Sequence, residues 1–174
     1  MMLMKGYIHV YTGNGKGKTT AALGLALRAA GAGKKVFIAQ FVKGREYSEI
    51  RALKRYLPQV KIKQYGRDCF IIKDPEEEDI SLARKGLSEV EKIVTEGRYD
   101  IIILDEATIA IYYKLFTHDE LASVLKKKKE DTEVIITGRN ASRELIDMAD
   151  LVTEMREVKH YYTGGIEARE GIEY

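Results

Sequence analysis

Short apolar runs alternate along this chain with longer stretches of helical periodicity, and this alternation constrains the fold more than any other feature. Strands are expected over Tyr7–Tyr11, Val36–Phe41, Val60–Tyr65, Ile101–Leu104, Glu133–Thr137 and Leu151–Met155. Helices are expected over Thr20–Ala32, Ser48–Tyr56, Ile80–Glu96, Thr117 to about Lys128, and Ser142–Ala149. Because parallel strands need helical crossovers, the pattern predicts an α/β fold with a mostly parallel sheet of about six strands and helices on both faces.

Length and composition set further limits. The 174 residues suit a single domain over residues 1–174. The net charge of +2, from 29 basic and 27 acidic side chains, argues against a nucleic-acid partner. No apolar run reaches membrane-spanning length and residues 1–10 lack a signal-peptide pattern, so a cytoplasmic protein without a membrane partner is expected. The single cysteine, Cys69, excludes an intrachain disulfide.

The segment between the first expected strand and helix is rich in glycine and reads TGNGKGKTT, residues 12–20. A strand, a glycine-rich turn and a helix that begins near Lys-Thr form the context of a P-loop. In such a loop, backbone N–H groups turn toward phosphate oxygens and the helix N-terminus adds positive potential. Lys18 is expected to contact the phosphates, and Thr19 to offer its hydroxyl to Mg²⁺. The competing interpretation is a glycine-rich turn that binds nothing.

The spacing of this loop departs from the usual G-x-x-x-x-G-K-[ST] pattern. Only three residues separate Gly13 from Gly17, and Thr12 stands where the first glycine belongs. The loop is therefore one residue shorter, or is entered differently, which argues against ordinary placement of a γ-phosphate for attack. Spacing alone does not identify what the loop holds.

An acidic pair, Asp105 and Glu106, follows the apolar run Ile101–Leu104 and resembles a Walker B element. Carboxylates at the carboxyl end of a parallel strand face the loop of the first strand and bind Mg²⁺ directly or through water. The alternative is an acidic start to the next helix, which the helix dipole favours. Beside a P-loop, metal binding is the favoured interpretation.

Taken together, the motifs resemble those of the ATP:corrinoid adenosyltransferases of the bacterial vitamin B12 pathway, in the same order and from Tyr7 to Tyr174. The resemblance rests on TGNGKGKTTAALGLALRAAG, AQFVKG, ILDE, VIITGRN and the closing ADLVTEMREVKHYYTGGIEAREGIEY. The short P-loop and the closing segment are its most specific parts, since general P-loop ATPases share the first but not the last.

The resemblance implies a transferase in which a reduced cobalt(I) corrinoid attacks C5′ of ATP and inorganic triphosphate leaves, in adenosylcobalamin biosynthesis or salvage. It implies that Lys18 and Glu106 are catalytic, and that Thr19, Glu106 and Asp105 hold Mg²⁺. Phe70 is implied to help displace the lower axial ligand of cobalt. A homodimer and a reduced flavoprotein as electron donor are also implied. The implied ATP-binding residues are Gly13, Asn14, Gly15, Lys16, Gly17, Lys18, Thr19, Thr20 and Arg28.

Two other functions remain open from the sequence. A P-loop small-molecule kinase or ATPase would produce ADP, although the short loop and the closing segment argue against it. A non-catalytic module in which ATP gates corrinoid binding would bind its ligands without turnover.

Overall fold

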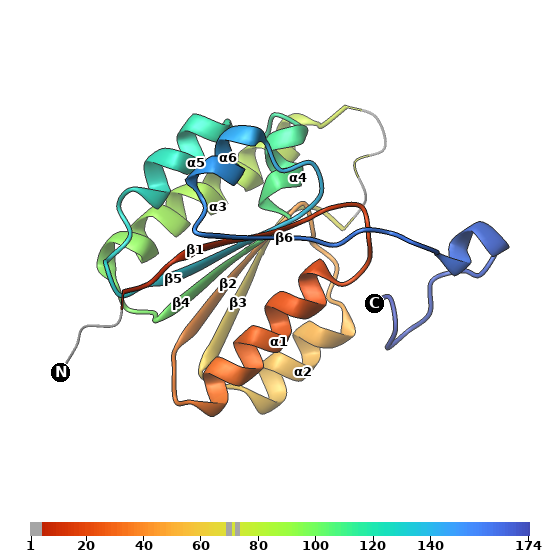
Figure 1. The fold of residues 1–174 in the computed structure, drawn as a ribbon, viewed down its shortest axis with the longest axis horizontal. Helices are drawn as coiled ribbons and strands as arrows, with labels where there is room; N and C mark the ends of the chain where they lie inside the picture. Colours follow the sequence, from red (N-terminus) through yellow and green to blue (C-terminus); the bar gives the residue numbers. More distant parts are fainter. Residues whose placement is uncertain (1–4, 69–70, 72–73) are drawn as a thin grey trace.

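The structure is a computed structural model that describes residues 5–68, 71 and 74–174. In this part of the chain, one parallel sheet has the strand order β3-β2-β4-β5-β1-β6 (Figure 1). The predicted α/β fold with a mostly parallel sheet is therefore confirmed. The strands are β1 (Ile8–Thr12), β2 (Val36–Phe41), β3 (Val60–Tyr65), β4 (Ile101–Asp105), β5 (Glu133–Thr137) and β6 (Leu151–Glu154).

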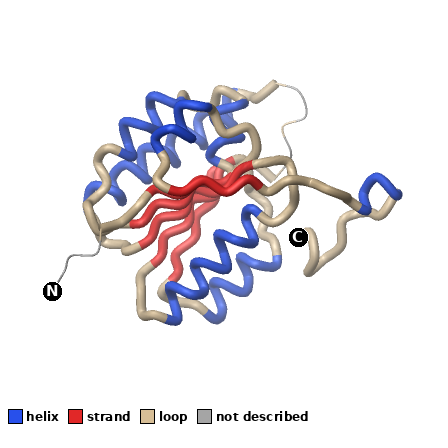
Figure 2. Tube along the Cα trace, viewed as in Figure 1, coloured by secondary structure: helices blue, strands red, loops and turns tan. Residues whose placement is uncertain are grey.

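Helices cover both faces of this sheet, as Figures 1 and 2 show. On one face lie α1 (Lys18–Gly31) and α2 (Ser48–Tyr56), and on the other lie α3 (Glu77–Glu96), α4 (Ala107–Tyr112), α5 (His118–Leu125) and α6 (Arg143–Met148). The buried face of α1 consists largely of alanines, including Ala22 and Ala26, so the helix packs close to the strands. Among the described helices, none has both the length and the apolar character needed to cross a membrane.

Two helix starts show how local side chains fix these elements. A capping box opens α5, because Glu120 N–H donates to Thr117 Oγ1 (3.1 Å) and Thr117 N–H donates to Glu120 Oε2 (2.7 Å). Helix α3 begins at Glu77, three residues before the predicted start at Ile80, because Glu76 and Asp79 form a second capping box. The sequence does not predict α4, since six mostly apolar residues are too few to show a helical period.

The register of the strands places polar side chains level with one another at the carboxyl edge of the sheet. Gln40 of β2 pairs with Asp105 of β4, and Tyr11 of β1 pairs with Thr137 of β5. Loops that follow β1, β2, β4 and β5 therefore meet at this edge, where ligands bind in open parallel sheets. Beyond β6, residues 155–174 include the 3₁₀ turn η1 (Tyr161–Gly164), and the chain end returns toward the start of α1 (Figure 1).

Candidate active site

The glycine-rich loop joins β1 to α1 in a conformation that requires its glycines. Gly13 and Gly17 have φ values of 97° and 112°, a region that residues with a side chain rarely adopt. The loop also passes against the backbone that follows β6, where Gly15 N–H donates to Met155 O at 2.7 Å. A Cβ on Gly15 would lie 2.6 Å from the same oxygen, and one on Gly13 would overlap it. The glycines thus permit both the turn and its close packing.

Lys18 begins α1 and folds back across the loop. Its Nζ donates to Gly15 O at 2.6 Å, and the residue is only 8% exposed. Burial lowers the pKa of Lys18 and nearby Arg139 adds to this effect, while Glu106 and Asp105 oppose it. An ammonium group therefore lies at the centre of the loop and donates to a backbone carbonyl of the loop itself.

Asp105 ends β4 and is buried beneath the cavity. Its Oδ1 accepts from Thr19 Oγ1 (2.8 Å) and Thr137 Oγ1 (2.6 Å), and its Oδ2 accepts from Gln40 Nε2 (3.1 Å) and Lys43 Nζ (2.9 Å). Burial alone would raise the pKa of Asp105, but Lys43 and these hydrogen bonds outweigh burial and lower it. With four donors around it, the carboxylate supports neighbouring side chains and does not face the cavity.

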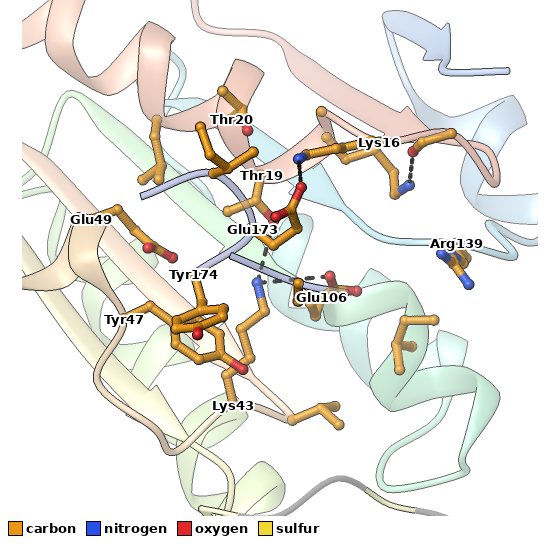
Figure 3. Close-up of a pocket in the computed structure, with 18 of the residues that line it drawn as sticks. Lys16, Thr19, Thr20, Lys43, Tyr47, Glu49, Glu106, Arg139, Glu173 and Tyr174 are labelled. Carbon is orange, nitrogen blue, oxygen red and sulfur yellow. Dashed lines mark hydrogen bonds and ion pairs between the residues drawn. The ribbon is translucent and has the colours of Figure 1, made fainter. Parts of the chain in front are cut away.

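Glu106 directly follows β4 and faces the cavity that Figure 3 shows in close-up. Its φ of 58° turns the chain sharply into α4, and its N–H donates to Thr137 Oγ1 at 3.1 Å. Burial raises the pKa of Glu106 and the charge of Asp105 adds to the rise, whereas Lys43 and Lys18 oppose it. The two neighbouring carboxyl groups therefore have opposite pKa shifts.

Two cationic side chains at this site, Lys43 and Arg139, are not predicted from the sequence to belong to it. Lys43, just after β2, lies 3.8 Å from Glu106 Oε1, and Arg139, just after β5, lines the same cavity. Both belong to quoted segments, AQFVKG and VIITGRN, that follow expected strands. Knowledge of the strand order would have singled them out, because β2 and β5 flank β4.

The closing segment of the chain docks on the glycine-rich loop. Lys16 Nζ lies 2.7 Å from Glu173 Oε1 and 3.0 Å from the Tyr161 hydroxyl, and Figure 3 shows Glu173 directed toward Lys16. Glu157 N–H donates to Asn14 Oδ1 at 3.1 Å. The two parts of the sequence that are most specific for the resemblance are therefore in direct contact.

The structure brings most of the predicted site residues together. Glu106 and residues 14–20 line one cavity of about 1080 Å³, and Gly13 and Asp105 are not among the described residues that line it. Arg28 is exposed in the last turn of α1, and it is not among the described residues that line this cavity. Phe70 lies outside the described residues. The predicted grouping of the loop with the acidic pair is thus observed, whereas Arg28 is not brought to it.

Among the described residues, no group of three or more His, Cys, Asp or Glu side chains is arranged to hold a metal ion.

Fold and site together define a parallel α/β protein whose ligand cavity lies at the carboxyl edge of the sheet, against a glycine-rich loop at a helix N-terminus. The model of the family described as ATP:corrinoid adenosyltransferase BtuR/CobO/CobP matches residues 4–174. The chain therefore belongs to the ATP:corrinoid adenosyltransferase family and is a transferase, as the resemblance of its motifs predicts.

Relatives of this family share nearly the whole chain. The corrinoid adenosyltransferase of Escherichia coli strain K12 is 36% identical over 171 residues, which are 98% of this chain and 86% of that protein. The corrinoid adenosyltransferase CobA of Salmonella typhimurium is also 36% identical, with the same coverage of both chains. The corrinoid adenosyltransferase of a Sinorhizobium species is 35% identical over 98% of this chain and 81% of its own length.

Proposed function

We propose that this chain transfers the 5′-deoxyadenosyl group of ATP to the cobalt of a reduced corrinoid, in adenosylcobalamin biosynthesis or salvage. Cobalt(I) donates an electron pair to C5′, the C5′–O bond breaks, and its electrons leave with inorganic triphosphate, so that cobalt(I) becomes cobalt(III). The observation that carries the proposal is that the glycine-rich loop, Lys18 and Glu106 line one cavity in a chain of this family. Family membership supports this reaction over a kinase, an ATPase or a non-catalytic module.

Within this proposal, residues 13–20 form the binding loop for the triphosphate. Lys18 lies at the N-terminus of α1 and needs only to exchange its contact with Gly15 O for a phosphate oxygen. A fixed cation at that position stabilises the negative charge that the leaving triphosphate develops. No general base is needed, because cobalt(I) is already nucleophilic. The protein therefore contributes orientation and leaving-group electrostatics.

We further propose that Thr19 and Glu106 bind Mg²⁺, with Asp105 as their support. The Thr19 hydroxyl and the Glu106 carboxylate are oxygen donors of the kind Mg²⁺ prefers, and both line the cavity. The Thr19 hydroxyl donates its proton to Asp105 and accepts from Lys43 Nζ at 3.3 Å, which leaves one lone pair for a cation. A Cβ on Gly138 would lie 3.3 Å from Glu106 Oε2, so a glycine here leaves room for that carboxylate. Bound Mg²⁺ would neutralise charge on the triphosphate.

Several wider proposals rest on the family resemblance. We propose a single cytoplasmic domain over residues 1–174 that works as a homodimer, with a reduced flavoprotein as the electron donor that reduces the corrinoid cobalt to cobalt(I). Arg28 as a residue at the nucleoside end and Phe70 as an aid in displacing the lower axial ligand of cobalt complete the proposed set, although Arg28 does not line the described cavity. Both assignments derive from the positions of these residues in the family pattern.

Product analysis tests the reaction. The chain is incubated with ATP, Mg²⁺ and a chemically reduced corrinoid, and phosphorus NMR follows the phosphate products. We expect one intact inorganic triphosphate for each adenosylcorrinoid, with almost no ADP. Stoichiometric ADP with free phosphate or a phosphorylated acceptor would instead identify a kinase or an ATPase. Ligand binding without any product would identify the non-catalytic module.

A further inference from the structure

Lys43 holds its ammonium group where the proposed metal-binding side chains converge. Its Nζ lies 2.9 Å from Asp105 Oδ2, 3.3 Å from Thr19 Oγ1 and 3.8 Å from Glu106 Oε1. Figure 3 shows the side chain directed from the end of β2 toward Glu106. Only 19% of the Lys43 side chain is exposed, so this ammonium group has little access to water. A cation of the protein itself therefore already contacts both proposed metal ligands and their support.

The backbone around Lys43 fixes this position. Val42 has a φ of 60°, which a β-branched residue rarely adopts, and it turns the chain immediately before Lys43. Gly44 and Gly66 let the loops after β2 and β3 cross in close contact. A Cβ on Gly44 would lie 2.6 Å from Arg67 O, and one on Gly66 would overlap the backbone nitrogen of Lys43. Such backbone conformations persist only where the surrounding structure enforces them, so Lys43 is held in place by the fold.

We propose that Lys43 is a built-in cation of the metal site, which neutralises Asp105 and competes with a divalent cation for Glu106. As a result, a divalent cation binds weakly to the protein alone and binds tightly only together with a triphosphate. The inference deepens the proposed function and rests on it at one point, the assignment of Thr19 and Glu106 as metal ligands.

Charge and ligand number explain this behaviour. Lys43 cancels one of the two carboxylate charges, and its ammonium group repels an incoming dication. A triphosphate supplies both negative charge and additional oxygen ligands, which is how Mg²⁺ is commonly held beside phosphates. Lys43 can then release Glu106 and keep its 2.9 Å contact with Asp105, so the buried carboxylate never loses its counter-charge.

Binding of Mn²⁺ alone tests the proposal without any turnover. Free Mn²⁺ is measured by electron paramagnetic resonance in the absence of nucleotide, for the wild type, Lys43→Gln, Lys43→Arg and the control Lys61→Gln. Lys61 is exposed on β3, so its variant removes an equal charge far from Asp105. We expect Lys43→Gln to bind Mn²⁺ at least about tenfold more tightly than the wild type, since even a water-like dielectric gives this much relief of repulsion. Lys43→Arg and Lys61→Gln should resemble the wild type.

A second measurement needs no variant. By linkage, calorimetry should find that ATP binds the wild type more tightly with Mn²⁺ than with a chelator. The proposal would be overturned if Lys43→Gln bound Mn²⁺ no more tightly than the wild type. It would also be overturned if Mn²⁺ did not change the affinity of the wild type for ATP. Adding Glu106→Gln to Lys43→Gln should abolish the increase in Mn²⁺ affinity. An increase that persists in the double variant would mean that Glu106 is not a metal ligand. Adenosyl transfer, measured separately, reports on the proposed function.

Discussion

Replacing Asp105 by asparagine should destabilise the fold, and the four contacts of its carboxylate indicate why. One oxygen accepts from two threonine hydroxyls, and the other accepts from Gln40 and the Lys43 ammonium group. An asparagine can keep its oxygen toward Gln40 and Lys43 only by turning its amide N–H groups toward Thr19 and Thr137. The two hydroxyls must then rotate to accept, and Lys43 loses its nearest counter-charge.

The size of this effect follows from the degree of burial. Breaking a buried ion pair by removing one partner typically costs about 3–5 kcal/mol. Lys43 keeps Glu106 Oε1 at 3.8 Å as a second counter-charge, so part of the loss is offset. We therefore expect Asp105→Asn to lower the free energy of unfolding by about 2–4 kcal/mol. Urea denaturation followed by circular dichroism measures this difference.

A surface ion pair provides the matched control. Asp147 pairs with Arg143 at 3.0 Å on α6, with side chains that are 57% and 81% exposed. Asp147→Asn should cost no more than about 1 kcal/mol, because exposed pairs of this kind contribute little. If Asp105→Asn costs as little as this control, the buried network does not stabilise the fold as its geometry indicates.

Three further predictions concern the cavity. Lys18→Ala should slow adenosyl transfer by roughly 10²–10³-fold, the scale for losing one strong transition-state stabiliser, in single-turnover kinetics. Glu106→Gln should leave the circular dichroism spectrum unchanged and reduce Mg²⁺-dependent turnover by about 10–100-fold, measured across a Mg²⁺ titration. Glu173→Gln should loosen the closing segment from Lys16, so that limited proteolysis cuts residues 161–174 faster than in the wild type.

Each of these predictions has a clear contrary result. A normal rate of adenosyl transfer in Lys18→Ala would mean that Lys18 does not stabilise the leaving triphosphate. An unchanged Mg²⁺ dependence in Glu106→Gln would mean that this carboxylate does not serve the metal. For the closing segment, Glu170→Gln is the control, since Glu170 pairs with exposed Arg51 on α2 instead of with the glycine-rich loop. Equal protection of Glu173→Gln and this control would show that Lys16 does not hold the segment.

Elements with strong local signals were predictable from the sequence. Buried parallel strands such as β2 and β4 give continuous apolar runs, and the Thr117–Glu120 capping box marks a helix start within four residues. The glycine-rich loop was equally visible, since its spacing and its following helix lie within one short segment. These parts of the fold depend on neighbours in the sequence.

The polar network was not predictable because it depends on strand order. The partners of Asp105 come from α1, β2, β5 and the loop after β2, and no local pattern states that these segments meet. Its role as a support for Thr19 and Lys43, instead of a group facing the cavity, therefore required the structure. The contact between Lys16 and Glu173 is equally remote, since it joins the start of the chain to its end.

The pairing of β1 has a consequence for how the chain acquires its site during synthesis. In the described sheet β1 lies between β5 and β6. Ile8 therefore cannot pair until Val134 has been synthesised, and His9 cannot complete its pairing until Leu151 has been synthesised. The glycine-rich loop in turn packs against Met155. A nascent chain that has emerged only through β4 has the loop sequence and Asp105, but it lacks β5, β6 and Met155, and contacts of such long sequence separation form slowly. Nucleotide binding should consequently arise only when nearly the whole chain has left the ribosome.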